Sequence, residues 1–136
     1  MNVYDKIKNV RGEIMREKIS VIGVKRLGDD ELFLQVDHEV NLDAIKPAGQ
    51  MLVDSDELAF VYLLEKNNDY TYVLIKEETW TGLVKAVMSK SRVYLDNGVE
   101  KMELVDFIDE LNYLIENIKG NSNYGEAMVA KVEAIF

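Results

Sequence analysis

Three acidic side chains fall within four consecutive positions between two apolar runs of this chain. They are Asp54, Asp56 and Glu57, in the stretch Val-Asp-Ser-Asp-Glu that begins at position 53. Carboxylate oxygens are the ligands that Mg²⁺ and Ca²⁺ prefer, so this spacing could hold a divalent cation. Asp and Ser also form turns by bonding to nearby backbone, and a turn between two strands needs such residues without any ion. The turn is the favoured interpretation, and no metal or other cofactor is predicted.

Two further candidates lie where a strand pattern changes to a helical one. Glu77 and Glu78 could act as general acid and base, although acidic residues at a helix start are better explained by the helix dipole. Trp80, the only tryptophan, could offer a flat binding surface. Its spacing with Val84 and Val87 favours packing in the core instead. Glu78 and Trp80 are therefore candidate binding residues and not catalytic ones.

A polar loop precedes the last helical stretch, at residues 121–125. Its Asn121, Asn123 and Tyr124 could bind an anion at a helix N-terminus. A capping box formed by Asn123 and Glu126 explains the same pattern. His38 is the only histidine, which excludes a paired-histidine metal site, and the chain has no nucleophile elbow and no glycine-rich phosphate loop. No catalytic residue is predicted.

Composition restricts the class of protein. The 136 residues, 48% hydrophobic and 30% charged, are typical of one folded domain. The 25 acidic and 16 basic residues give a net charge of −9, which repels a phosphate backbone, so nucleic acid is not expected as a partner. The chain has no cysteine, as expected in the reducing cytoplasm, and it has no apolar run long enough to predict a membrane span or a signal peptide.

Turn residues divide the first part of the chain into strand pairs. Three hairpins are predicted, joining residues 19–27 to 32–36, 58–64 to 70–75, and 92–95 to 99–102. The segment 42–53, interrupted by Pro47, is either a short strand or an irregular crossing. The central pair is apolar at nearly every position, which predicts a cover on both faces, by helices on one and by sheet curvature or a partner on the other.

Three stretches have helical spacing, at residues 79–88, 104–119 and from about Asn123 to the end. Gly82 inside the first indicates close packing, and Gly120 ends the second. The sequence therefore predicts an α+β fold. An antiparallel sheet of about six strands, built from hairpins, carries one helix between hairpins and two C-terminal helices packed against it.

The first 14 residues allow two interpretations. Their apolar residues recur at helical spacing, which predicts an amphipathic helix docked on the sheet: Val3, Ile7, Val10 and Ile14. Alternatively, the Arg-Gly-Glu at 11–13 can be encoded by a purine-rich ribosome-binding sequence ahead of Met15. Residues 1–14 would then be a translated leader, and the native start would be Met15 rather than Met1. Both interpretations stay open, and residues 15–136 are predicted to form a single domain.

Three blocks carry a resemblance, at residues 49–56, 78–81 and 117–125. In order and spacing they resemble stretches of an uncharacterised family of small proteins from Gram-positive bacteria of the bacillus and staphylococcus kind. The resemblance extends over about residues 18–136 and leaves residues 1–14 without a counterpart. It implies a small cytoplasmic protein, and it supplies no catalytic or binding residues because the family has no established activity.

Two function classes follow from these observations. The first is a protein-interaction or regulatory module without catalysis, whose doubly apolar central hairpin could contact a partner or a second copy of the chain. The second is a small-molecule-binding protein or an enzyme of unfamiliar type. Its site would lie near Asp54, Glu78, Trp80 and the loop at residues 121–125, if folding brings them together. The first class is preferred.

Overall fold

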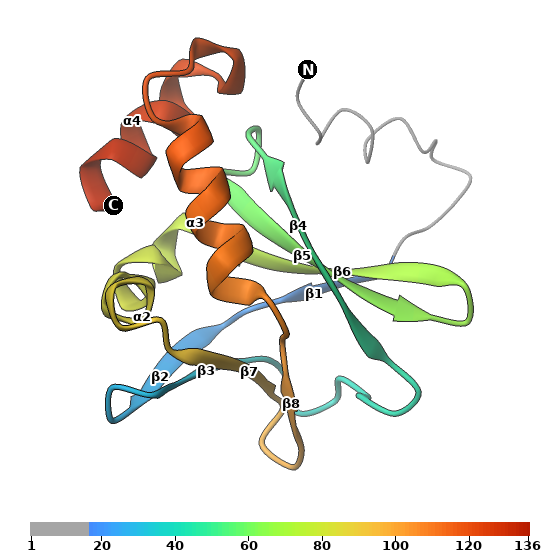
Figure 1. The fold of residues 1–136 in the computed structure, drawn as a ribbon. Helices are drawn as coiled ribbons and strands as arrows, with labels where there is room; N and C mark the ends of the chain where they lie inside the picture. Colours follow the sequence, from blue (N-terminus) through green and yellow to red (C-terminus); the bar gives the residue numbers. More distant parts are fainter. Residues whose placement is uncertain (1–16) are drawn as a thin grey trace.

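The computed structural model describes residues 17–136, in which six strands precede a helical segment, two more strands follow it and two helices end the chain (Figure 1). The strands are β1 (Glu17–Ser20), β2 (Gly23–Leu27), β3 (Glu31–Gln35), β4 (Lys46–Asp54), β5 (Ala59–Lys66), β6 (Asp69–Lys76), β7 (Arg92–Asp96) and β8 (Lys101–Glu103). The helices are α2 (Val84–Ser89), α3 (Phe107–Ile118) and α4 (Glu126–Ile135), with the 3₁₀ turns η1 (Glu77–Leu83) and η2 (Ser122–Tyr124). Both interpretations of residues 1–14 lie outside the described residues.

The predicted central hairpin forms the middle of a first sheet, ordered β1-β6-β5-β4. β5 and β6 pair antiparallel along their whole length, and Asn67 and Asn68 turn the chain with φ of 51° and 64°. Asparagine tolerates this left-handed region, which a two-residue hairpin turn requires. The undecided middle segment is a nine-residue edge strand, β4, with a bulge between Pro47 and Met51. Proline fits there because an edge strand leaves one side of its backbone unpaired.

The other two predicted hairpins meet in a second sheet, ordered β2-β3-β7-β8. The turn between β7 and β8 is built on Asn97, which is buried. Its Oδ1 accepts hydrogen bonds from the amides of Val99 and Glu100, at 2.9 and 2.7 Å. Its Nδ2 donates to the carbonyl of Val40 at 2.8 Å, which ties the turn to the chain ahead of β4. This hairpin is confirmed.

The prediction of one antiparallel sheet of about six strands is wrong, because the structure has two mixed sheets of four strands each within residues 17–136. β1 runs parallel to β6, with Glu17 opposite Thr71, and β3 runs parallel to β7, with Glu31 opposite Arg92. Turn residues indicate only which consecutive strands pair. Parallel strands are joined through long crossovers and leave no local signal. The α+β class itself is confirmed.

β1 and β2 belong to one continuous run that changes sheet. The amide of Val21 donates to the carbonyl of Leu74 in β6 at 3.0 Å, whereas the next amide, of Ile22, donates to the carbonyl of Gln35 at the end of β3 at 2.8 Å. The chain therefore leaves the first sheet and enters the second within two residues. We call residues 20–24, Ser-Val-Ile-Gly-Val, the junction segment.

The main core lies between the helices and the two sheets. The ring of Phe60 in β5 lies 4.9 Å from that of Trp80 in η1, and the ring of Tyr62 lies 5.8 Å from that of Phe107 in α3. A second, separate cluster occupies the opposite face of β5 and β6, formed by Val61, Leu63, Tyr72 and Leu74. The prediction that the central strands are apolar on both faces is therefore confirmed.

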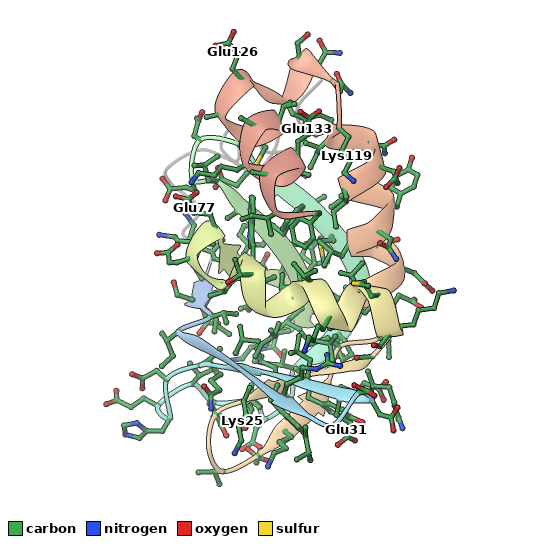
Figure 2. The ribbon with its side chains drawn as sticks, turned by 90° about the vertical axis from the view of Figure 1, so that its left-hand side faces the viewer. Lys25, Glu31, Glu77, Lys119, Glu126 and Glu133 are labelled. Carbon is green, nitrogen blue, oxygen red and sulfur yellow. The ribbon has the colours of Figure 1, made fainter. Side chains whose placement is uncertain are left out.

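The predicted helix at residues 79–88 is a 3₁₀ turn followed by the short helix α2. A Cβ on Gly82 would lie 3.2 Å from Cβ and Cγ1 of Val24 in β2, so the glycine permits a close approach, as predicted. Gly120 follows α3 with φ of 69°, which explains why the helix stops there. Figure 2 shows the two C-terminal helices, with Lys119 and Glu133 close together, far from Lys25 and Glu31 in the second sheet.

Candidate functional site

Asp54 ends β4 and holds the turn into β5. Its side chain is 3% exposed, and Oδ1 accepts a hydrogen bond from the amide of Glu57 at 3.0 Å. Burial raises the pKa of the Asp54 carboxyl, with smaller contributions in the same direction from the charges of Glu57 and Asp56. Asp56 lies exposed in the same turn. The arrangement is that of the favoured interpretation, a turn closed by an aspartate.

Trp80 is fully buried and its indole has a partner. Nε1 donates to the carbonyl of Ile75 at 2.9 Å, and the ring packs between those of Phe60 and Phe136, at 4.9 and 6.0 Å. A ring with no exposed surface offers no platform to a ligand in this conformation. The core-packing interpretation of its spacing is confirmed.

Glu77 and Glu78 begin η1, and their side chains differ in surroundings. Glu77 Oε2 lies 3.3 Å from Nζ of Lys131 in α4, so this carboxylate joins η1 to the last helix. Glu78 is exposed. The amide of Glu77 donates to the carbonyl of Leu58 at 3.0 Å, which places the start of η1 against the turn that Asp54 closes.

The loop at residues 121–125 forms η2 and caps itself. Asn121 Oδ1 accepts from the amide of Asn123 at 3.1 Å, and Asn121 Nδ2 donates to the carbonyl of Asn117 at 3.2 Å. Tyr124 packs against the main core. The expected capping box is absent from this part of the structure, because α4 begins at Glu126 after Gly125 and not near Asn123. The backbone of Gly125, with φ of 93°, redirects the chain between η2 and α4.

Folding therefore brings together only part of the candidate set. The turn of Asp54 and Asp56 adjoins Glu77 and Glu78 at one end of the first sheet. Trp80 lies beneath them and points into the core. The loop at residues 121–125 is held by its own hydrogen bonds and by α3.

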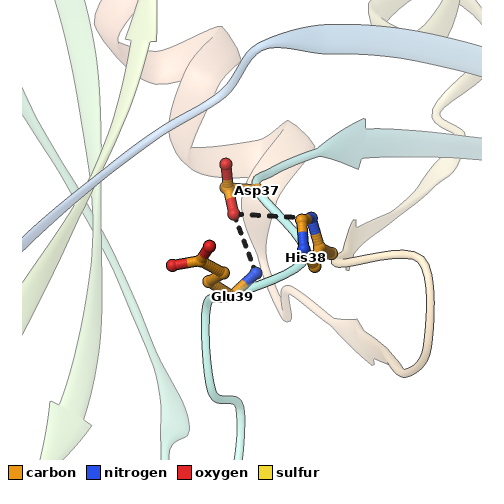
Figure 3. A group of neighbouring side chains, drawn as sticks. All are labelled: Asp37, His38 and Glu39. Atoms are coloured by element: carbon orange, nitrogen blue, oxygen red, sulfur yellow. Dashed lines mark hydrogen bonds and ion pairs between the residues drawn. The ribbon is translucent and has the colours of Figure 1, made fainter.

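His38 lies in an exposed turn with acidic neighbours on both sides (Figure 3). Asp37 Oδ1 accepts the amide hydrogen of Glu39 at 2.8 Å and lies 3.7 Å from Nδ1 of His38. The three side chains can offer ligand atoms within 4.8 Å of one another. Exposed acidic groups of this kind are common without an ion, and Asp37 is already used by the turn, so the cluster does not by itself form a metal site.

A feature that the sequence pattern did not single out lies at the junction segment. Ile22 is 69% exposed. On one side of it is a hollow of about 590 Å³, lined by the junction segment, by Lys76 at the end of β6 and by residues of η1, among them Glu78 and Thr79. On the other side is a hollow of about 420 Å³, lined among others by Asp37, His38 and Asp96. Glu78 is the one candidate residue that lines either hollow.

Comparison with known proteins gives a family. A family model, described as a family of unknown function, UPF0738, matches residues 20–136. The chain belongs to this family. The UPF0738 protein YjbL of Bacillus subtilis strain 168 is 46% identical over 122 residues, which are 90% of this chain and 99% of the relative. A UPF0738 protein of Geobacillus kaustophilus is 46% identical over 123 residues, 90% of this chain and 98% of its own. No solved structure matches the chain.

The expected resemblance to an uncharacterised family of bacilli is confirmed, with relatives in Bacillus, Geobacillus and Lysinibacillus. Members of UPF0738 have no assigned function, so the family supplies no residue roles. Within residues 17–136, no helix combines the length and the hydropathy needed to cross a bilayer. The role of this UPF0738 chain must therefore be argued from its geometry.

Proposed function

We propose that this UPF0738 chain is a cytoplasmic protein-interaction or regulatory module without catalysis, and that residues 15–136 act as one domain. The junction segment is the proposed contact surface. The observation that carries the proposal is Ile22, a β-branched apolar side chain that is 69% exposed between two hollows. None of the five residues of the junction segment carries a charge. An exposed apolar side chain within an uncharged segment can be buried against a partner chain.

The other sheet edges carry protection of the kinds that natural proteins use. β4 is covered by α3, whose Glu110 accepts a hydrogen bond from the amide of Met51 at 3.2 Å. β8 is only three residues long and contains Lys101 and Glu103. β1 begins with two charged residues, Glu17 and Lys18. Short length, charge and a covering helix each hinder edge pairing. The junction segment itself carries no charge, although it leads into Lys25 and Arg26 of β2 and Gly82 of η1 packs against its Val24.

The second candidate function is small-molecule binding, favoured by the volume of the larger hollow. About 590 Å³ lies within the usual range for ligand pockets, and Glu78 lines it. Ligand pockets enclose most of their ligand with apolar and aromatic side chains. Here the one tryptophan is sealed in the core and the exposed apolar side chain, Ile22, stands between two hollows. This arrangement favours a macromolecular partner.

Site-specific photo-cross-linking in Bacillus subtilis tests the proposal. A benzophenone amino acid replaces Ile22 in one variant and, as controls, Met88 or Tyr113, which are 78% and 66% exposed. We expect a discrete protein adduct from position 22 and none from positions 88 and 113. The captured protein is then purified and its affinity for the chain measured, which should fall on Ile22→Asp. Equal adducts at all three positions, or an affinity that Ile22→Asp leaves unchanged, would reject the junction segment as the contact.

A further inference from the structure

We propose that residues 1–14 of this chain form an amphipathic helix that covers the outer face of the first sheet. The outer face is the side of β5 and β6 that points away from the main core, and it carries the second cluster, formed by Val61, Leu63, Tyr72 and Leu74. The inference goes beyond the proposed function and does not depend on the contact at Ile22. It favours the docked helix over the translated leader, since a leader has no reason to fit this face.

The outer face is apolar where a sheet face in contact with water would be polar. The side chains of its cluster are 2% to 8% exposed. Within residues 17–136, the apolar side chains that pack against them are Ala48 and Leu52, both from the neighbouring strand β4 of the same sheet. The buried side chains of α3 and α4 belong to the main core, on the other face. Strands that are apolar on both sides are typical of a sheet covered on both faces, so the outer face requires a covering layer of its own.

Residues 1–14 have the pattern and the length of such a layer. Their apolar residues recur three or four positions apart, which places them in one stripe along a helix: Val3, Ile7, Val10 and Ile14. A helix over these residues is about 21 Å long at 1.5 Å per residue. The strands β5 and β6, of eight residues each, are about 26 Å long. The helix can therefore span the outer face nearly from end to end.

The path of β1 brings the segment to this face. β1 is an edge strand of the first sheet, and it begins with Glu17 opposite Thr71, near the start of β6. A chain that turns back at residues 15–16 can run along the outer face toward the other end of β6. The turn that Asp54 closes lies at that end, because the last residue of β4 and the first of β5 pair there with each other and with the last residue of β6.

Charge favours residues 1–14 over a second copy of the chain as the occupant. Four basic and two acidic residues lie ahead of β1, in a chain whose net charge is −9. Lys6 and Arg11 each lie three or four positions from two residues of the stripe, so they border it on either side. The turn that the helix would approach holds one ammonium, of Lys76 at 3.5 Å from Glu57, and three carboxylates, those of Asp54, Asp56 and Glu57. A second copy would bring the same negative charge to its twin, whereas this segment brings the opposite one.

A spin label in the full chain tests the placement. The chain has no cysteine, so Lys8→Cys gives a single site for a nitroxide, on the side of the helix away from the stripe. We expect the label to broaden the methyl signals of the outer face, which are those of Val61, Leu63 and Leu74. The signals of Leu111 in α3, on the other side of the sheet, should keep their intensity. Broadening of neither set, or of both sets equally, would overturn the proposal.

Two substitutions in the labelled chain test the apolar stripe. Val10→Asp places a charge on the stripe, and the matched control Asn9→Asp places the same charge away from it. We expect Val10→Asp to restore the outer-face signals and Asn9→Asp to leave them broadened. Both positions lie outside residues 17–136, and unchanged signals of the main core report that the domain stays folded. Equal behaviour of the two variants would refute docking through the stripe.

A mixture of labelled and unlabelled chains identifies whose segment lies on the face. With the methyl groups observed only in the unlabelled copy, we expect their signals to keep full intensity, because each chain covers its own sheet. Broadening of the outer-face signals in the unlabelled copy would make a second copy the occupant and would overturn the proposal.

Discussion

Tyr62→Phe isolates one buried hydrogen bond whose contribution changes with pH. Tyr62 is fully buried in β5, and its hydroxyl donates to the carbonyl of Val105 at 2.6 Å, which anchors the start of α3 to the first sheet. Removing the hydroxyl leaves this carbonyl with one partner fewer. Loss of such a bond lowers the free energy of unfolding by about 1.5 kcal/mol at neutral pH.

At alkaline pH, the stability difference between the wild type and Tyr62→Phe should reverse. Burial raises the pKa of Tyr62 from 10.0 to about 12, because the phenolate is poorly solvated in the core. Because the pKa of Tyr62 is higher in the folded than in the unfolded protein, the neutral phenol contributes its full stabilisation of the fold below pH 10. This contribution is lost as the pH rises toward 12. Two pKa units correspond to roughly 3 kcal/mol. The phenylalanine of the variant cannot ionise, so the variant, less stable at pH 7, becomes the more stable protein above about pH 11.

Urea unfolding of both proteins between pH 7 and 12, followed by circular dichroism, measures this crossing. Tyr113→Phe is the control, because Tyr113 is 66% exposed and its replacement should leave the wild-type curve unchanged at every pH. A difference between Tyr62→Phe and the wild type that stays constant from pH 8 to 12 would refute the reasoning about the buried phenol.

Substitutions at four further positions test the local structure by urea unfolding. Burial raises the pKa of the Asp54 carboxyl, so the ionised side chain opposes folding at pH values above that pKa. Asp54→Asn keeps a side-chain oxygen that accepts from the amide of Glu57, and its stability should match or exceed that of the wild type at pH 7. Asp54→Ala loses this hydrogen bond and should lose about 1 kcal/mol of stability. Gly82→Ala should lose about 1 to 2 kcal/mol against Val24, and Val24→Ala should relieve part of that loss. Asn97→Ala should lose about 2 to 4 kcal/mol, because it gives up the bonds to Val40, Val99 and Glu100.

The sequence predicts those parts of the fold that are encoded locally. Asn67 and Asn68, Asn97 with Gly98, and the Gly28 turn each specify a hairpin, because only a few residue types tolerate the φ angles of these turns. The stripe along α3 predicts its buried face for a similar reason, a period of 3.6 residues. The parallel pairs, β1 with β6 and β3 with β7, depend on packing between strands that are distant in sequence. Residues near these strands in the sequence therefore do not indicate the pairing.

The change of sheet at the junction segment is visible in the sequence as a shift in the alternation of inward-facing residues. The high strand propensity of the whole run makes this shift easy to overlook. Ile19 and Val21 point into the core at odd positions, and the next inward position of the run is Val24, an even one. A single strand alternates strictly, so a shift of phase marks a break in pairing. Both halves have the composition of one β-branched strand, which is why the first hairpin appeared to begin at residue 19.

The exposure of Ile22 follows from this shift and not from a shortage of space in the core. At a point where consecutive amides bond to different sheets, one side chain must face neither core, and Val21 and Val24 already fill the inward positions on either side. Packing therefore places no demand for an apolar residue at position 22, where a threonine or a lysine would suit both the strand and the solvent. Isoleucine is itself a good strand former, so its presence is compatible with folding alone. The proposed contact with another chain adds a second reason, because burial in a complex stabilises an apolar side chain that otherwise lies in water.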